Sequence, residues 1–130
     1  MITIRPNGQN NRKLRPRTYL LYHEETLIGY IAVATMAIEF VIPEAPNESR
    51  NDPQGVLLGK LFVAESCRGQ GVGNIAMAFA LDLASKINQL TGCAGVIVHS
   101  HQNSVGFYER LGFIHIEEDE NEKTMFFKLA

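Results

Sequence analysis

The chain has 130 residues, of which 45% are hydrophobic, and a formal net charge of −2 at pH 7. We expect one domain, residues 1–130, with a single core. The balanced charge excludes a global field that would attract nucleic acid or an anionic membrane, although a local basic patch stays open. The two cysteines are too few for a disulfide framework or a cysteine zinc site, and they indicate a reducing compartment.

The first 17 residues are interpreted as a basic arm that precedes the core, residues 18–130. Five positive charges lie in this arm: Arg5, Arg12, Lys13, Arg15 and Arg17. Its Asn, Arg and Pro content indicates a loosely ordered tail or a short edge strand, with an RNA-contacting or acid-binding arm as the alternative. The arm has no signal-peptide core, and the longest apolar stretch, 27–38, is too short to span a membrane. We therefore expect a cytoplasmic protein.

A hairpin and a long loop are predicted next. Residues 18–23 and 27–40 are rich in β-branched and aromatic side chains and flank the polar turn 24–26. Residues 43–53 contain three prolines and several charges, which is typical of a loop. A loop of this length either borders a functional site or is simply mobile.

A strand, a glycine turn and a helix start follow one another at the centre of the chain. The apolar strand 57–64 leads into a polar turn, and Gly71 and Gly73 then open a helix over 73–90. Amide groups at a helix N-terminus lack intrahelical partners and lie at the positive end of the helix dipole. Glycines let this backbone approach an anion closely, so the turn suits a phosphate or pyrophosphate group.

The spacing of the glycines separates three kinds of phosphate-binding loop. A Walker loop requires a lysine after its last glycine, where this chain has Asn74. A dinucleotide fingerprint counted from Gly69 also fails at Asn74, and Gln89 stands near the place of its ribose-binding acid. The third pattern, R-x-x-G-x-G, is matched in full by residues 68–73.

The helix over 73–90 has an apolar stripe that is predicted to pack on the sheet. Large residues four positions apart form its row: Ile75, Phe79, Leu83 and Ile87. Four further apolar residues join this row: Val72, Ala76, Ala80 and Leu90. A short, fully apolar strand over 94–99 follows. A helix between two apolar strands is a βαβ unit, so these strands should run parallel through a right-handed crossover.

The C-terminal third is predicted to hold one short helix and a strand pair. The helix covers 103–111 and ends at Gly112, and the antiparallel strands are 113–117 and 124–129. The predicted fold class is therefore α/β (α+β). Its sheet is mixed and mostly antiparallel, with one central parallel strand pair, and helices flank it.

Two segments carry a resemblance to a known family. Residues 68–73 supply R-x-x-G-x-G, and Asn103–Phe113, NSVGFYERLGF, is similar to a second signature, which begins with asparagine and ends in F-Y-x-x-x-G-F. Together they resemble the GCN5-related N-acetyltransferase (GNAT) superfamily over roughly residues 18–129, and most closely its toxin-type branch. The resemblance implies a GNAT-like sheet whose central parallel strands splay apart.

The resemblance also implies binding of acetyl-coenzyme A. Backbone groups of Leu61, Phe62 and Val63 would hold its pantetheine arm, and amides from Arg68 to Gly73 its pyrophosphate. Arg68 would add a charge-assisted contact or cap the turn, and Asn103 would bond the arm or N-cap its helix. The implied cofactor-binding residues are Leu61, Phe62, Val63, Arg68, Gly69, Gln70, Gly71, Val72, Gly73, Asn103 and Phe107.

Tyr108 matches the general acid of this family. A thiol leaves with a pKa of about 8.5 and a phenol keeps its proton to about pH 10, so Tyr108 is able to protonate the leaving thiolate. The alternative is a tyrosine that packs beside Phe107 and makes a structural hydrogen bond. The resemblance thus implies acetyl transfer to a primary amine through a ternary complex, or else an acetyl-coenzyme A binding module without catalysis.

No general base stands out among Glu39, Glu44, Glu65 and His99. An α-amino group with a pKa of about 8 is about a tenth neutral at pH 7, whereas a lysine at about 10.4 is under a thousandth. A missing base therefore favours an α-amino acceptor. The H-x-H pair of His99 and His101 is a metal site or a structural pair, and we expect no metal because no third ligand lies nearby. Cys67 is an activated thiol or a plain small residue.

The partners follow from the same resemblance. Toxin-type relatives acetylate the α-amino group of aminoacyl-tRNA and pair with an antitoxin, although the acidic balance of this chain argues against tRNA and leaves a small-molecule amine open. The family usually places a strand and two helices before the hairpin, whereas only 17 mostly polar residues precede Thr18 here. The acceptor site is then open, absent or completed by another subunit. Exposed apolar sheet surface would favour a homodimer, and no membrane partner is expected.

Overall fold

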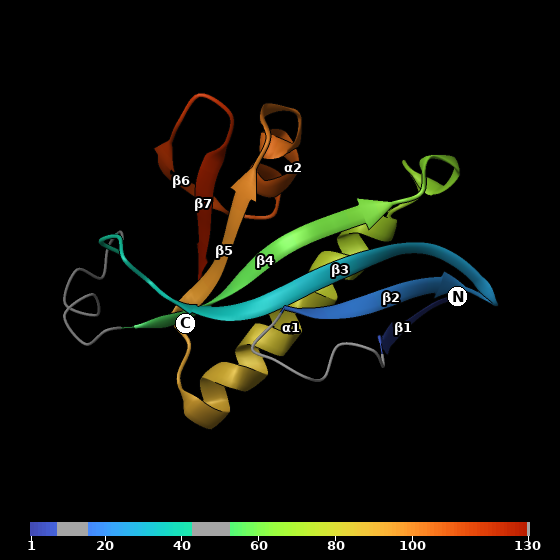
Figure 1. The fold of residues 1–130 in the computed structure, drawn as a ribbon, viewed down its shortest axis with the longest axis horizontal. Helices are drawn as coiled ribbons and strands as arrows, with labels where there is room; N and C mark the ends of the chain where they lie inside the picture. The colour runs from blue at the N-terminus through green and yellow to red at the C-terminus, as the bar shows by residue number, and fades with distance from the viewer. Residues whose placement is uncertain (8–15, 43–52, 130) are drawn as a thin grey trace. The chain divides into compact units, whose positions relative to one another are not determined.

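The structure is a computed structural model that describes residues 1–7, 16–42 and 53–129 (Figure 1). The predicted loop 43–52, the predicted base Glu44 and the basic residues Arg12, Lys13 and Arg15 lie outside the described residues. The described elements are β1 (Ile2–Pro6), β2 (Arg17–His23), β3 (Thr26–Ala37), β4 (Gln54–Val63), η2 (Glu65–Cys67), α1 (Val72–Thr91), β5 (Gly95–Ser100), η3 (Gln102–Ser104), α2 (Val105–Arg110), β6 (Ile114–Glu118) and β7 (Lys123–Lys128).

The described strands pair in the order β1-β2-β3-β4-β5-β7-β6. Every pair is antiparallel except β4 and β5, which run parallel. This confirms the predicted fold class of a mixed, mostly antiparallel sheet with one central parallel pair and helices. Of the described helices, not one combines the length and the apolarity that a membrane crossing requires.

Residue contacts divide the chain into two compact units. The first unit comprises Met1–Ala34 and Leu58–Leu83, and the second comprises Thr35–Leu57 and Ala84–Ala130. Each unit contains one of the two motifs that carry the family resemblance. The glycine turn belongs to the first unit and Tyr108 to the second.

The N-terminal segment enters the first unit as an edge strand. β1 pairs antiparallel with β2, with Ile2 opposite His23 and Pro6 opposite Tyr19. Of the two structures predicted for the arm, the short edge strand is the one found over residues 2–6, so the sheet begins ahead of residue 18. The part of the chain described before β2, residues 1–7 and 16, contains no helix.

The buried face of α1 differs from the predicted one. Ile75 is 43% exposed and Leu90 is 82% exposed, so the predicted apolar stripe is wrong for these two residues, whereas its members Val72, Ala76 and Ala80 are buried. Phe79 is only half-buried and packs edge-on against Tyr19, with ring centroids 4.7 Å apart. A helix whose buried side chains are mostly small approaches its neighbours closely. In α1 the buried residues are small apart from Met77: Val72, Ala76, Met77, Ala80 and Ala84.

The second unit is built on the neighbouring strands β5, β7 and β6. β5 pairs antiparallel with β7 from Gly95 opposite Lys128 to Ser100 opposite Lys123. The pairing of β6 with β7 confirms the antiparallel pair predicted at the C-terminus. Figure 1 shows α2 near the C-terminal end of β5, where η3 leads into it. The core of this unit contains a cluster of buried residues from three segments, namely the stretch after β3, β5 and β7: Ile38, Ile42, Ile97 and Phe126.

A glycine fixes the close approach of β3 to β4. A methyl group on Gly29 would overlap the carbonyl oxygen of Phe62, whereas one on Gly59 would lie 3.7 Å from the carbonyl oxygen of Ala32, an ordinary contact. We expect Gly29→Ala to lower the free energy of unfolding by about 1–3 kcal/mol because the strands must move apart. The matched control Gly59→Ala should change it by less than about 0.5 kcal/mol. Urea denaturation of both variants measures this, and equal losses would contradict it.

Candidate functional site

Two glycines in the turn between η2 and α1 have backbone conformations that side chains rarely adopt. Gly69 has φ +78° and Gly71 has φ +82°, both in the left-handed region. A Cβ atom at either position would meet no heavy atom within 4 Å. Backbone conformation therefore favours glycine here, and the space beside both residues is open to a ligand.

The turn places amide donors that have no acceptor within the helix at the start of α1. The first helical hydrogen bond of α1 runs from the Ile75 N–H to the Gly71 carbonyl, at 3.1 Å. The amides of Val72, Gly73 and Asn74 precede this bond and have no acceptor within the helix. No acidic side chain lies in the first turn of α1. These donors and the positive end of the helix dipole fit the oxygens of a diphosphate.

Arg68 connects this turn to the end of β4. Its Nε donates a hydrogen bond of 3.0 Å to the Val63 carbonyl, and its guanidinium carbon lies 5.9 Å from the centroid of the Phe62 ring. A guanidinium has five N–H donors, and this bond uses one of them. Capping the turn and binding an anion, the two roles predicted as alternatives, are therefore compatible.

Of the three β4 residues predicted to pair with a pantetheine arm, Leu61 and Val63 differ from Phe62 in the direction of their backbone groups. The Phe62 carbonyl faces Gly29 of β3, and the Ala64 N–H donates to β3 at 2.7 Å. Backbone groups alternate in direction along a strand, so those of Leu61 and Val63 are directed away from β3. Leu61 and Val63 thus fit the predicted pairing, whereas the backbone of Phe62 is taken up by the sheet.

Phe62 instead exposes its side chain at the surface. The ring is 43% exposed and stacks on Tyr30, with centroids 5.6 Å apart and an interplanar angle of 24°. The turn itself is closed by Gln70, whose Nε2 donates to the Ser66 carbonyl at 3.3 Å. The exposed Phe62 ring and the Arg68 guanidinium form one surface at the end of β4.

Cys67 borders a cavity of about 240 Å³ in the first unit. Its side chain is half-buried, and its sulfur lies 3.8 Å from the Ser66 hydroxyl. The cavity is lined by Ile2, His23, Ile28, Cys67, Gln70, Val72 and Ile75. In the described parts of the chain no basic side chain bonds the thiol, so these contacts fit a plain small residue better than an activated nucleophile.

Tyr108 in α2 has a buried ring, and its hydroxyl has no hydrogen-bond partner among the described residues. Its side chain is 8% exposed and packs edge-on against Phe107 and Phe113, with centroids 5.2 and 5.4 Å away. The phenol oxygen makes no hydrogen bond to any residue that the structure describes. Burial raises the pKa of Tyr108 above its ordinary value of 10.0. The hydroxyl therefore keeps its proton through neutral pH and has no structural partner among the described residues.

Asn103 lies in η3 rather than at the start of the helix. Ser104 occupies the N-cap position of α2, and no side chain caps that helix. The predicted N-cap role of Asn103 is therefore wrong, because a turn of 3-10 helix, Gln102–Ser104, comes between β5 and α2. The exposed Asn103 amide makes no hydrogen bond to a described residue, so it remains free for a ligand.

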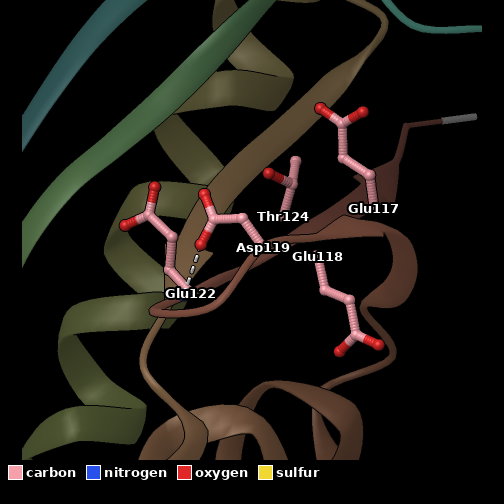
Figure 2. A pocket seen from close by; sticks show the side chains of 5 residues that line it. All are labelled: Glu117, Glu118, Asp119, Glu122 and Thr124. Carbon is pink, nitrogen blue, oxygen red and sulfur yellow. Dashed lines mark hydrogen bonds between the residues drawn. The ribbon is translucent and has the colours of Figure 1, made fainter.

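The acidic turn between β6 and β7 encloses a second cavity, of about 260 Å³, lined by Glu117, Glu118, Asp119, Glu122 and Thr124 (Figure 2). Asp119 accepts hydrogen bonds of 2.9 Å from the amides of Asn121 and Glu122, and these bonds lower the pKa of Asp119. Glu118 pairs with Lys123 at 3.5 Å. Both carboxylates thus shape and tether the turn.

His99 differs from the other predicted general bases by its polar contacts. Its Nδ1 lies 3.0 Å from the Thr124 hydroxyl and 4.0 Å from a carboxylate oxygen of Glu122. Glu39 and Glu65 are exposed. Sequence reasoning missed this cluster, because only the register of β5 with β7 places Thr124 opposite His99. Within the described residues, no group of three or more His, Cys, Asp or Glu side chains forms a metal site.

Comparison with known proteins identifies the family. A sequence model described as "Acetyltransferase (GNAT) family" matches residues 4–113. Among curated protein sequences, none matches the chain. Solved structures match over 98% of this chain, and they include AtaT complexed with acetyl-methionyl-tRNAfMet, with 22% identity, 95% of that chain covered and a TM-score of 0.79.

Two further structures have the same fold. The KacTA–DNA complex matches with 22% identity, 93% of that chain covered and a TM-score of 0.78. A mutant of the AtaT toxin bound to the C-terminus of the antitoxin AtaR and acetyl-CoA matches with 21% identity, 93% coverage and a TM-score of 0.77. The match to the family model covers most of the chain and includes both motifs, so the chain belongs to the GNAT acetyltransferase family.

Proposed function

We propose that the protein is an N-acetyltransferase that transfers the acetyl group of acetyl-coenzyme A to a primary amine while both substrates are bound. The observation that carries this proposal is the turn over residues 68–73, in which left-handed glycines precede helical amides that have no acceptor within α1. Membership in the GNAT family supports it, as does the acetyl-CoA bound to a mutant of AtaT. We further propose that residues 1–130 act as a single acetyltransferase domain.

Most of the predicted cofactor-binding residues keep their roles in this proposal. The Arg68 N–H already donates to the Glu65 carbonyl at 3.2 Å, so the amides from Gly69 to Gly73 bind the diphosphate. The remaining guanidinium donors of Arg68 add a charge-assisted contact. Leu61 and Val63 pair with the pantetheine arm through their backbones, and Phe62 contributes its exposed ring. The remaining contacts come from Asn103, through its free amide, and from Phe107.

Tyr108 acts as the general acid. The neutral amine attacks the thioester carbonyl carbon, the C–S bond breaks, and the departing sulfur takes the proton of the Tyr108 hydroxyl. The acetylated nitrogen loses one proton to solvent, and the tyrosinate regains one. A raised phenol pKa keeps Tyr108 protonated until the thiolate, with an ordinary pKa of about 8.5, needs the proton.

An α-amino acceptor suits this mechanism best. About a tenth of an α-amino group is neutral at pH 7, so attack needs no strong base. The acceptor is then an aminoacyl group or a small amine. AtaT was solved with acetyl-methionyl-tRNAfMet and with an antitoxin, which makes aminoacyl-tRNA and an antitoxin the first partners to test here. The net charge of −2 favours a small amine over tRNA.

Labelled acetyl-coenzyme A tests the proposal directly. The protein is incubated with the label and with two panels, one of small primary amines and one of aminoacyl-tRNAs. We expect label to appear on at least one acceptor, and the panel in which it appears decides between an enzyme of small amines and a tRNA-acetylating toxin. Tight binding without label transfer in either panel would overturn catalysis and support a binding module instead.

We also propose that the protein is a homodimer. Several large apolar side chains are exposed among the described residues: Met1, Leu27, Val41, Phe62, Ile75, Leu90 and Ile114. Burying such side chains against a second copy would stabilise the pair. We expect light scattering at micromolar concentration to give twice the mass of the 14.5 kDa chain. A mass of one chain under these conditions would refute the dimer.

A further inference from the structure

Four aromatic side chains of the second unit form a continuous row of ring contacts that includes the proposed general acid. Tyr108 packs edge-on against Phe107 on one side and Phe113 on the other. Phe113 in turn contacts Phe127 of β7, with centroids 5.4 Å apart and an interplanar angle of 50°. Phe113 is 3% exposed, so it is the innermost ring that touches Tyr108.

The backbone turn between Tyr108 and Phe113 brings the Phe113 ring into contact with the Tyr108 ring. The amides of Leu111 and Phe113 both donate to the Tyr108 carbonyl, each at 3.1 Å. This closed turn requires Gly112, which has φ +102°. The position of the Phe113 ring against Tyr108 is thus fixed by backbone hydrogen bonds as well as by packing on β7.

We propose that Phe113 is a positioning residue for the proposed acetyl transfer, and that its ring holds the Tyr108 phenol in one orientation and keeps water from its buried side. The proposal rests on the function proposed above. Tyr108 itself would give up the proton, and Phe113 acts only through Tyr108.

The charge state of the phenol gives this role a chemical consequence. A tyrosinate is stabilised by water, and removal of water favours the protonated phenol. Burial is the cause of the raised pKa of Tyr108, and in the described residues no hydrogen bond to the phenol oxygen opposes it. A smaller residue at position 113 would admit water beside the ring and return the pKa toward its ordinary value of 10.0.

Phe127 offers a matched control. It contacts Phe113 but makes no ring contact with Tyr108, and it is half-buried in β7. Phe113→Leu and Phe127→Leu therefore remove the same number of atoms from the same row of rings. Only the first removes a ring that touches Tyr108.

The experiment is a spectroscopic titration of Tyr108 that requires no catalysis. The chain has four tyrosines, so the ultraviolet titration of each protein is compared with that of its Tyr108→Phe counterpart, and the difference is the signal of Tyr108. We expect Phe113→Leu to move the midpoint of Tyr108 ionisation to lower pH, toward about 10. Phe127→Leu should leave the midpoint of Tyr108 ionisation at its wild-type value. Phe113→Tyr keeps an aromatic ring at position 113, so it should also keep the wild-type midpoint.

The steady-state measurement uses the same variants. Phe113→Leu should lower kcat about tenfold with an unchanged KM for acetyl-coenzyme A, and the alkaline limb of its pH profile should move with the titration. Equal midpoints in wild type and Phe113→Leu, or an equal movement in Phe127→Leu, would overturn the proposal. If Phe113→Leu does not fold, Phe113→Met, whose flexible side chain fills irregular gaps, replaces it with the same expectation. A protein that shows the titration difference but no acetyl transfer would refute only the proposed function.

Discussion

Gly71→Glu is expected to remove most of the thermal stabilisation that acetyl-coenzyme A gives to the protein. Gly71 has φ +82°, where a residue with a Cβ atom costs roughly 1–2 kcal/mol. A carboxylate at the start of α1 also repels the diphosphate by about 1–4 kcal/mol at 4 Å in a solvated site. The strain lowers stability with and without the ligand, whereas a repulsion of about 2 kcal/mol weakens binding about 30-fold.

The expected thermal shift follows from mass action. A ligand present at about 100 times its Kd stabilises a folded protein by about 2.7 kcal/mol, and a loss of affinity of about 30-fold reduces this to about 0.9 kcal/mol. At about 4 °C per kcal/mol for a domain of this size, the increase in Tm falls from about 11 °C to about 4 °C. Thermal denaturation with and without acetyl-coenzyme A measures both values.

Gly92→Glu is the matched control. Gly92 has φ +92° and open space within 4 Å of a Cβ atom, so the substitution causes the same backbone strain and adds the same charge. It follows the C-terminal end of α1, whereas the amides proposed to bind the diphosphate lie at the N-terminal end. This variant should be less stable than the wild type and still gain its full shift from the ligand. Equal thermal shifts with acetyl-coenzyme A in Gly71→Glu and the wild type would contradict the assignment of this turn as the diphosphate site.

A second control separates strain from charge at the same position. Asparagine tolerates the left-handed region better than most side chains and carries no charge. Gly71→Asn should therefore keep more of the thermal shift than Gly71→Glu. A loss as large as that of Gly71→Glu would mean that close approach of the backbone, rather than repulsion, decides binding.

Local signals in the sequence were sufficient to predict the strand, the glycine turn and the helix. The apolar run, the glycine spacing and the helical periodicity all lie within about 30 residues, and each predicts an element without reference to the rest of the fold. The start of β4 was predicted at residue 57 and lies at Gln54. Such a difference reflects pairing with neighbouring strands, which apolar content alone does not reveal.

The buried face of α1 shows why packing was harder to predict. Two rows of residues four apart compete on this helix, a large one starting at Ile75 and a small one starting at Val72. The predicted stripe contained residues of both rows, whereas the structure buries the small row and leaves Ile75 of the large row exposed. Close approach to neighbouring elements decides between the rows, and that approach depends on the tertiary fold.

Contacts between distant residues could not be predicted for the same reason. His99 meets Thr124 only because β5 and β7 pair in one register. A short edge strand was one of two structures predicted for residues 1–17, and its pairing with β2 required the structure. By contrast, Tyr108 was found because the spacing of its motif is local, although its ring contact with Phe113 required the structure.

Tyr108→Phe is expected to lower kcat by about 100-fold or more, since a positioned general acid contributes roughly 10²–10⁴ to the rate. The variant loses only the hydroxyl, which makes no hydrogen bond to a described residue, so Tm should change little. The thermal shift with acetyl-coenzyme A should persist, because the ring and its contacts remain. Steady-state kinetics and thermal denaturation measure both. Tyr22→Phe, which removes a tyrosine hydroxyl from β2 in the first unit, should retain full activity.

The pH profile distinguishes an acid from a merely structural tyrosine. A general acid works only while it is protonated, so activity falls once the pH exceeds its pKa. Burial raises that pKa above 10.0, and the alkaline limb of kcat in the wild type should therefore lie above pH 10.0. In Tyr108→Phe no phenol remains to ionise at this position, so the residual activity should lose that limb. A wild-type limb that persists unchanged in Tyr108→Phe would assign the proton to another group.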